Sequence, residues 1–178
     1  MWNSKPVIAV FGSSQIIEDD AEYQQARLLG RLLAREGYVV CNGGYGGAME
    51  ASSRGASEEG GESIGLTLGI FSGGEANPFA TKEIKGKTLF ERLSNFVGLA
   101  DAFVTLRGGV GTLGELSIVW NLIQIGGLDS RPFILVGEFW PDVLENLRQN
   151  MRIREKDVRL LHIVSTPEEA VRHIKNCL

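Results

Sequence analysis

Residues that could bind an anion and act on a neighbouring group occur together between positions 107 and 115. An apolar run at 102–106 precedes this glycine-rich stretch, and a helix-like sequence at 116–123 follows it. In such a strand–turn–helix arrangement, the N–H groups and the dipole at the helix start favour an anion, most often a phosphate. Glycines permit close approach of the backbone, and a threonine adds a hydroxyl donor. We therefore expect a phosphate to contact Gly108, Gly109, Val110, Gly111 and Thr112.

Glu115 follows Thr112 by about one helical turn, so the two side chains share one face of the helix. A carboxylate in this position is better suited to a sugar hydroxyl, or to a developing positive charge, than to a phosphate. The alternative is that Glu115 only complements the helix dipole and that the glycines only form a tight turn. These residues alone leave both interpretations open.

The first two apolar runs cover residues 6–11 and 38–41, and each is followed by a further glycine-containing turn. Ligands bind at the carboxyl ends of the strands in open α/β sheets, so these turns are expected near the 107–115 stretch. The turns do not have the Gly-x-Gly-x-x-Gly spacing of a dinucleotide site. An alternative for the two serines is that they only cap the first helix. The residues that we expect to contact a substrate here are Gly12, Ser13, Ser14, Gly43, Gly44 and Gly47.

Apolar periodicity predicts alternating strands and helices, which is typical of a parallel sheet with helices on both faces. We therefore predict a single α/β domain over residues 1–178, with a Rossmann-like, doubly wound, mostly parallel sheet. The polar segment 71–87 is long for an irregular connection, and we interpret it as an active-site flap. The predicted strands are 6–11, 38–41, 63–69, 101–106, 131–137 and a short strand within 158–164. The predicted helices are 21–36, 48–59, 88–98, one that includes the helix-like sequence 116–123, 139–151 and one beginning near Thr166.

The composition excludes several classes of function. The chain of 178 residues has a formal net charge of −4, which argues against a nucleic-acid partner. Its two cysteines predict neither a disulfide framework nor a zinc site, so we expect no metal and no cofactor. No apolar run approaches the roughly 20 residues that cross a bilayer, and the first strand begins too early for a signal peptide. We expect a cytoplasmic protein without membrane contact.

Over nearly its whole length the sequence resembles the LOG (Lonely Guy) family of cytokinin riboside 5′-monophosphate phosphoribohydrolases, once labelled possible lysine decarboxylases. The family signature PGGxGTxxE aligns with 107–115, its GGxxGLM turn with 43–49, and its Arg-Lys pair with Arg92 and Leu93. Leu93 thus replaces the lysine of that pair. In three further departures, Arg107 replaces the signature's proline, and Asn42 and Glu50 replace glycines before and after the second turn. Arg107 either adds a cation near the phosphate or is a surface residue.

This resemblance implies hydrolysis of a purine nucleoside 5′-monophosphate, either AMP or a cytokinin type, to free base and ribose 5-phosphate. It implies that Arg92 and Glu115 are catalytic and that Met49 contacts the substrate, although Met49 also suits the core. It further implies a homodimer or a larger homo-oligomer. The alternative is a non-catalytic nucleotide or molybdenum-cofactor carrier of the same fold. The arrangement does not support a pyridoxal-dependent decarboxylase.

Overall fold

The computed structural model describes residues 1–69, 75–128 and 131–178 and contains one sheet of seven parallel strands within these ranges. The strand order β4-β3-β2-β1-β5-β6-β7 reverses direction at β1, which confirms the predicted doubly wound α/β fold. The strands are β1 Val7–Phe11, β2 Val39–Asn42, β3 Ser63–Leu68, β4 Lys82–Gly86, β5 Ala102–Thr105, β6 Phe133–Val136 and β7 His162–Val164.

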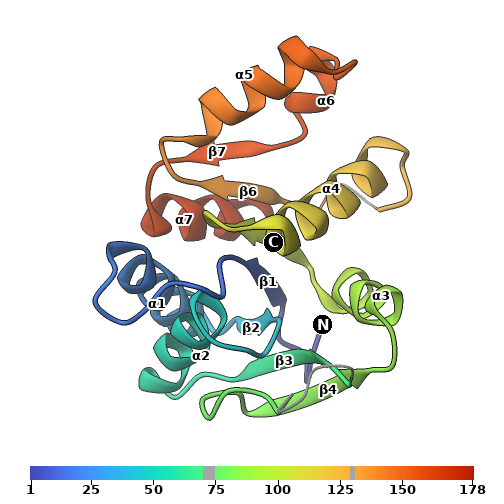
Figure 1. Ribbon diagram of the computed structural model, residues 1–178. Coiled ribbons are helices and arrows are strands. Elements are labelled where there is room, and N and C mark those ends of the chain that lie inside the picture. Colours follow the sequence, from blue (N-terminus) through green and yellow to red (C-terminus); the bar gives the residue numbers. More distant parts are fainter. Residues whose placement is uncertain (70–74, 129–130) are drawn as a thin grey trace.

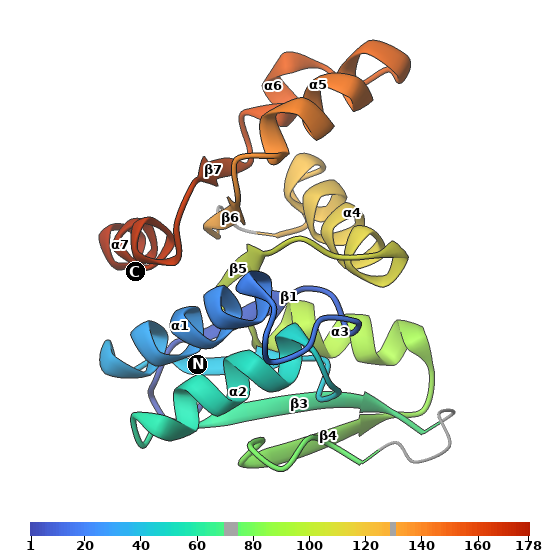
Figure 2. The same ribbon diagram turned by 60° about the vertical axis from the view of Figure 1, so that its left-hand side comes forward.

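Helices cover both faces of this sheet (Figures 1 and 2). Alternate residues of each strand point to opposite faces, so the sheet separates two apolar clusters. Val7, Ala9 and Phe11 pack with residues of α3, α4 and α5, whereas Ile8 and Val10 pack with α1, α2 and α7. The helices are α1 Ala21–Arg35, α2 Ala48–Glu58, α3 Leu89–Leu99, α4 Val110–Gln124, α5 Trp140–Asn150, α6 Glu155–Val158 and α7 Pro167–Cys177.

The structure corrects the interpretation of 71–87 as an irregular flap. Residues 71–74 lie outside the described residues, but Lys82–Gly86 forms β4, which pairs in parallel with β3 at the edge of the sheet. A strand at an edge is commonly polar and charged, which protects the sheet against pairing with other chains. Buried strands are recognised by their apolar residues. Strand β4 instead contains two lysines and a glutamate, so its sequence did not predict a strand.

The structure also defines two boundaries more narrowly than the sequence does. The last strand covers His162–Val164, within the segment 158–164 in which the sequence predicts a short strand. Residues 155–158 form the short helix α6, and Asp157 Oδ2 accepts from Arg154 N at 3.1 Å at its start. Helix α4 begins at Val110, ahead of the helix-like sequence at 116–123, so that Thr112 and Glu115 share one helix as expected. Gly111, Thr112 and Glu115 consequently belong to the helix itself, although glycine is unfavourable inside helices.

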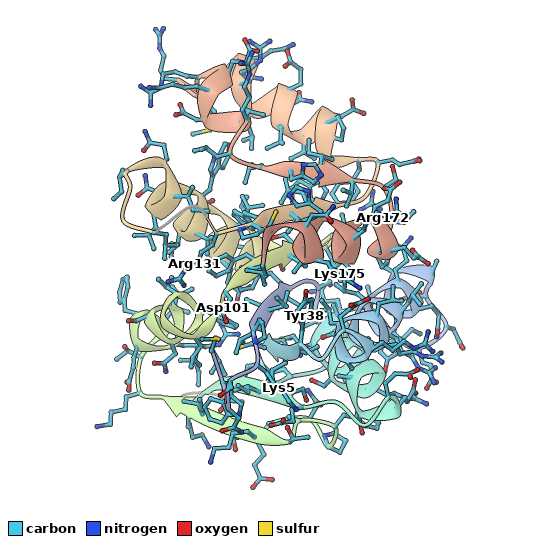
Figure 3. The ribbon with its side chains drawn as sticks, turned by 180° about the vertical axis from the view of Figure 1, so that it is seen from behind. Lys5, Tyr38, Asp101, Arg131, Arg172 and Lys175 are labelled. Carbon is cyan, nitrogen blue, oxygen red and sulfur yellow. The ribbon has the colours of Figure 1, made fainter. Side chains whose placement is uncertain are left out.

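Side-chain bonds close the edge of the sheet at which the strands begin. Figure 3 shows the molecule from behind and labels Lys5, Tyr38, Asp101 and Arg131, which lie just before strands. Asp101 Oδ2 accepts a hydrogen bond from Val7 N at 2.9 Å, and Arg131 Nη1 donates to two carbonyls at the end of α3. The glycine-rich turns lie at the opposite edge, where the strands end.

Candidate functional site

The loops after β1, β2 and β5 meet at the carboxyl edge of the sheet. Ser13 N donates to Arg107 O at 3.2 Å, and Ala48 N donates to Ser13 O at 2.8 Å. The contact requires glycine, because a Cβ at Gly47 would lie 2.3 Å from Ser13 O and one at Gly12 would lie 2.6 Å from Ala48 Cβ. The structure thus brings the three sequence-predicted turns into one cluster.

The N-terminus of α4 presents unpaired donors within this cluster. Its N-cap, Gly109, provides no side-chain hydrogen bond, and the first turn contains no acidic residue. The N–H groups of Val110, Gly111 and Thr112 donate to no acceptor in the part of the chain that the structure describes. Val110 is 88% exposed, so solvent or a ligand can reach this end of the helix. Unpaired N–H groups and the helix dipole together favour an anion here.

Asn42, a buried residue at the end of β2, holds the second glycine turn. Its Nδ2 lies within 3.0 Å of Met49 O, Ser52 Oγ and Ser53 Oγ, and its Oδ1 accepts from Gly44 N at 2.9 Å. Sequence reasoning treated Asn42 only as a departure from a family glycine. The available signal was a polar residue directly after a buried apolar strand, where its amide must find several partners.

Asn77 holds the same turn from the other side, and sequence reasoning missed it. Its backbone N donates to Gly44 O at 2.6 Å, and its Nδ2 donates to the carbonyls of Gly44 and Tyr45 at 3.2 Å each. Its Oδ1 accepts from Phe79 N at 3.2 Å. Because Asn77 lies in the segment interpreted as a flap, nothing in the local sequence connected it to a turn more than 30 residues earlier.

Arg92 and Glu115 form an ion pair beneath the surface of the cluster. Arg92 Nη1 lies 3.1 Å from Glu115 Oε1, and their side chains are 9% and 12% exposed. Arg92 Nε also donates to Leu66 O at 2.6 Å, and the guanidinium lies 5.1 Å from the centre of the Phe96 ring. These contacts from β3 and α3 fix the guanidinium in one orientation. Arg92 is therefore a positioned group and not a solvated helix arginine.

Burial raises the pKa of the Glu115 carboxyl above its ordinary value, and the neighbouring Arg92 reduces that effect without cancelling it. Glu115 Oε2 has no hydrogen-bond partner among the described residues. This oxygen remains available to a sugar hydroxyl or a water molecule. A partly desolvated carboxylate with a raised pKa is suited to accept a proton or to stabilise a neighbouring positive charge.

Gly43 and Met49 lie against Arg92. A Cβ at Gly43 would lie 2.2 Å from Arg92 Nη2 and 2.5 Å from Met49 Sδ, so only glycine leaves space for both. Met49 is 9% exposed, which fits either a core residue or a contact at the rim of the site. The second glycine turn therefore contacts the ion pair directly, a proximity that the sequence did not reveal.

Ser13 and Ser14 do not cap α1, whose N-cap is Asp20; Ser13 Oγ instead accepts from Gln15 N at 3.0 Å. Arg107 turns towards α1, where its Nη1 lies 3.1 Å from Glu22 Oε1. Its guanidinium also lies 4.4 Å from the centre of the Phe139 ring. Arg107 is thus paired on the other side of its loop and does not add a free cation at the start of α4.

Two features are absent from the ranges that the structure describes, 1–69, 75–128 and 131–178. No group of three His, Cys, Asp or Glu side chains in them is arranged to hold a metal ion. No helix in them is both long enough and apolar enough to pass through a bilayer.

Comparisons with known proteins identify relatives of this chain. The chain is 35% identical over 112 residues to a cytokinin riboside 5′-monophosphate phosphoribohydrolase of Mycobacterium marinum, covering 62% of this chain and 60% of that protein. It is 29% identical to a pyrimidine/purine nucleotide 5′-monophosphate nucleosidase of Escherichia coli K12, covering 97% of this chain but only 40% of that protein. The chain thus spans less than two thirds of the length of these two relatives.

Among solved structures, a molybdenum cofactor binding protein from Rippkaea orientalis has a TM-score of 0.76, with 25% identity and 97% of both chains covered. The model of the family described as "Possible lysine decarboxylase" matches residues 49–174, which is more than half of the chain. This match includes α3 with Arg92 and the complete glycine-rich start of α4 with Glu115. The chain therefore belongs to this family, to which the LOG-like motifs also pointed.

Proposed function

We propose that this protein hydrolyses the N-glycosidic bond of a nucleoside 5′-monophosphate. The observation that carries the proposal is the buried Arg92–Glu115 pair, which lies one helical turn beyond the unpaired N–H groups of α4. The names of the Mycobacterium marinum and Escherichia coli relatives support a nucleotide monophosphate as the substrate class.

In the proposed complex the 5′-phosphate accepts hydrogen bonds from the N–H groups of Gly109 to Thr112, aided by the Thr112 hydroxyl and the helix dipole. Glu115 Oε2 faces the ribose, where it accepts from a hydroxyl group and stabilises the oxocarbenium-like transition state. Arg92 keeps the other carboxylate oxygen in place at 3.1 Å. The first-loop residues Gly12, Ser13 and Ser14 complete the substrate-contacting edge.

The chemical step divides one water molecule between the products. The bond from ribose C1′ to the base nitrogen breaks, and the base leaves with the bonding electron pair and gains a proton. Water oxygen bonds to C1′ and transfers a proton to Glu115, which later releases it to solvent. Ribose 5-phosphate and free base result, and no oxidant, metal or cofactor is needed.

The substrate that we propose is a purine nucleotide, either AMP or a cytokinin type. The test is incubation of the purified protein with AMP and with cytokinin nucleotides, followed by chromatography for free base and ribose 5-phosphate. We expect both products in equal amounts, and we expect neither with the corresponding nucleosides, which lack the phosphate. Equal turnover of nucleotide and nucleoside would refute the assigned role of the α4 N-terminus.

We also propose that the protein forms a homodimer or a larger homo-oligomer. Helix α4 is apolar around most of its circumference, which is typical of a buried helix, yet Leu113 is 49% exposed. Phe90 on α3 is 81% exposed, and Ile125 at the end of α4 is 63% exposed. Light scattering coupled to size-exclusion chromatography tests this proposal, and a monomer at micromolar concentration would contradict it.

A second candidate function is a carrier of a phosphorylated cofactor. The Rippkaea orientalis molybdenum cofactor binding protein matches 97% of both chains, unlike the longer nucleosidase relatives. Leu93, where the LOG motif has lysine, also removes one cationic group beside Arg92. Tight binding of AMP without any release of base would favour this carrier, whereas catalytic release of base would exclude it as the main function.

A further inference from the structure

A cavity of about 650 Å³ lies at the same edge of the sheet, but on the far side of the Arg107 loop from the Arg92–Glu115 pair. Leu106 and Val136, which follow or end the central strands β5 and β6, provide apolar lining, and Ile16 closes it from the first loop. The remaining wall comes from α1, from the loop 137–139 after β6 and from residues 165–166, which precede α7. Helices α1 and α7 are neighbours on this face of the sheet (Figure 1). The volume is typical of a small-molecule site.

One wall of the cavity holds a cation–π contact between Arg107 and Phe139. The Arg107 guanidinium lies 4.4 Å from the centre of the Phe139 ring, and its Nη1 is held at 3.1 Å from Glu22 Oε1. A guanidinium held over an aromatic ring presents a flat surface on which a planar ligand can stack. Because Glu22 already neutralises the guanidinium, this surface is not a free cationic site.

The polar groups of the lining favour a ligand without negative charge. Glu138, Gln25 and the Ser165 hydroxyl line the cavity and have no hydrogen-bond partner among the described residues. The lining contains two carboxylates, Glu22 and Glu138, but only one cation, Arg107, so its formal charge is negative. The N–H groups of Ser165 and Thr166, at the start of α7, are already bonded to Glu169 Oε2. An anion would therefore meet net negative charge and few free donors.

We propose that this cavity is a second binding site, separate from the phosphate site, for an uncharged planar heterocycle with amino groups, that is, a nucleobase-like ligand. Such a ring stacks on the Arg107–Phe139 surface and rests on the apolar lining. Its amino groups donate to the unpartnered oxygens of Glu138 and Gln25. The proposal is independent of the hydrolase function, because it uses neither Arg92 nor Glu115.

The test uses adenine as the probe and methyl NMR as the measurement. Protein with ¹³C-labelled Ile, Val and Met methyl groups is titrated with adenine in the presence of saturating ribose 5-phosphate. Ile16 and Val136 report on the cavity, whereas Met49 reports on the Arg92–Glu115 site. We expect saturable shifts of Ile16 and Val136 that do not depend on ribose 5-phosphate.

Ser165→Trp places an indole at the exposed entrance and should weaken adenine binding at Ile16 and Val136 about tenfold or more. Ser57→Trp, at an exposed position on α2, is the matched control and should leave binding unchanged. The proposal is overturned if only Met49 shifts or if the cavity methyl groups do not move at the solubility limit of adenine. It is also overturned if Ser165→Trp, still folded by its methyl spectrum, binds adenine as well as the unmodified protein.

Discussion

Replacement of Glu115 by glutamine tests the proposed chemistry most directly. The substitution keeps the shape of the side chain and an oxygen that can still accept from Arg92 Nη1, now 3.1 Å from Glu115 Oε1. It removes the negative charge that would stabilise the cationic ribose and the site that would accept the proton of water. The substitution should therefore change turnover much more than it changes the stability of the fold.

The expected changes in turnover and in stability follow from the surroundings of the Arg92–Glu115 pair. Loss of one preorganised electrostatic contact lowers turnover by about 10²–10³-fold, or about 2.7–4 kcal/mol of transition-state stabilisation. The stability cost is smaller, because burial already disfavours the ionised carboxylate and Arg92 keeps its bond to Leu66 O. Because the raised pKa means that folding favours the neutral carboxyl, the neutral amide should change the unfolding free energy by no more than about 1–2 kcal/mol, equivalent to a few degrees in Tm.

The assay is chromatographic release of base from AMP at saturating substrate, with Tm measured by circular dichroism. Glu155→Gln is the matched control, since it removes the same charge from an exposed glutamate–arginine pair on α6. The control should retain full turnover. If Glu115→Gln keeps turnover within about threefold of the unmodified protein, electrostatic stabilisation by this carboxylate is refuted.

The same residue predicts a pH dependence. Burial raises the pKa of Glu115, so its carboxylate becomes protonated at a higher pH than an exposed glutamate does. As pH falls through that raised pKa, kcat/KM should decline, and this acid limb should be absent from the residual activity of Glu115→Gln. The native state also binds this proton more tightly than the unfolded state, so ionisation of Glu115 costs stability as pH rises through this window. The free energy of unfolding, measured across pH 4–8 for the unmodified protein and for Glu115→Gln, should show this loss of stability with rising pH only in the unmodified protein.

Two further predictions use other features of the site. Gly43→Ala should lower turnover at least about tenfold, because its Cβ would lie 2.2 Å from Arg92 Nη2, whereas Gly46→Ala meets no atom within 4 Å and should be neutral in the same assay. In the native protein a chromogenic thiol reagent should titrate exposed Cys177 and spare Cys41, because Cys41 is buried and burial raises the pKa of its thiol. Rapid reaction of both thiols before unfolding would contradict this burial.

The sequence determined the parts of this protein that depend on local patterns. Continuous apolar runs identified the buried strands β1, β2, β5 and β6, since a strand covered on both faces favours apolar side chains throughout. The glycine-rich turn before Glu115 predicted a helix start with free N–H groups, the proposed anion site, because that arrangement requires only residues adjacent in the chain. The edge strand β4 escaped prediction because its side chains are exposed and polar.

Only the tertiary structure decided how distant segments combine. The pairing of Arg92 with Glu115 depends on where the sheet places α3 and α4, and the fixed orientation of Arg92 depends on a carbonyl of β3. The clamp formed by Asn77 on the second glycine turn, and the turn of Arg107 towards Phe139, likewise join segments more than 30 residues apart. Such contacts leave no periodic trace in the sequence, because their geometry is set by the order of strands in the sheet and not by neighbouring residues.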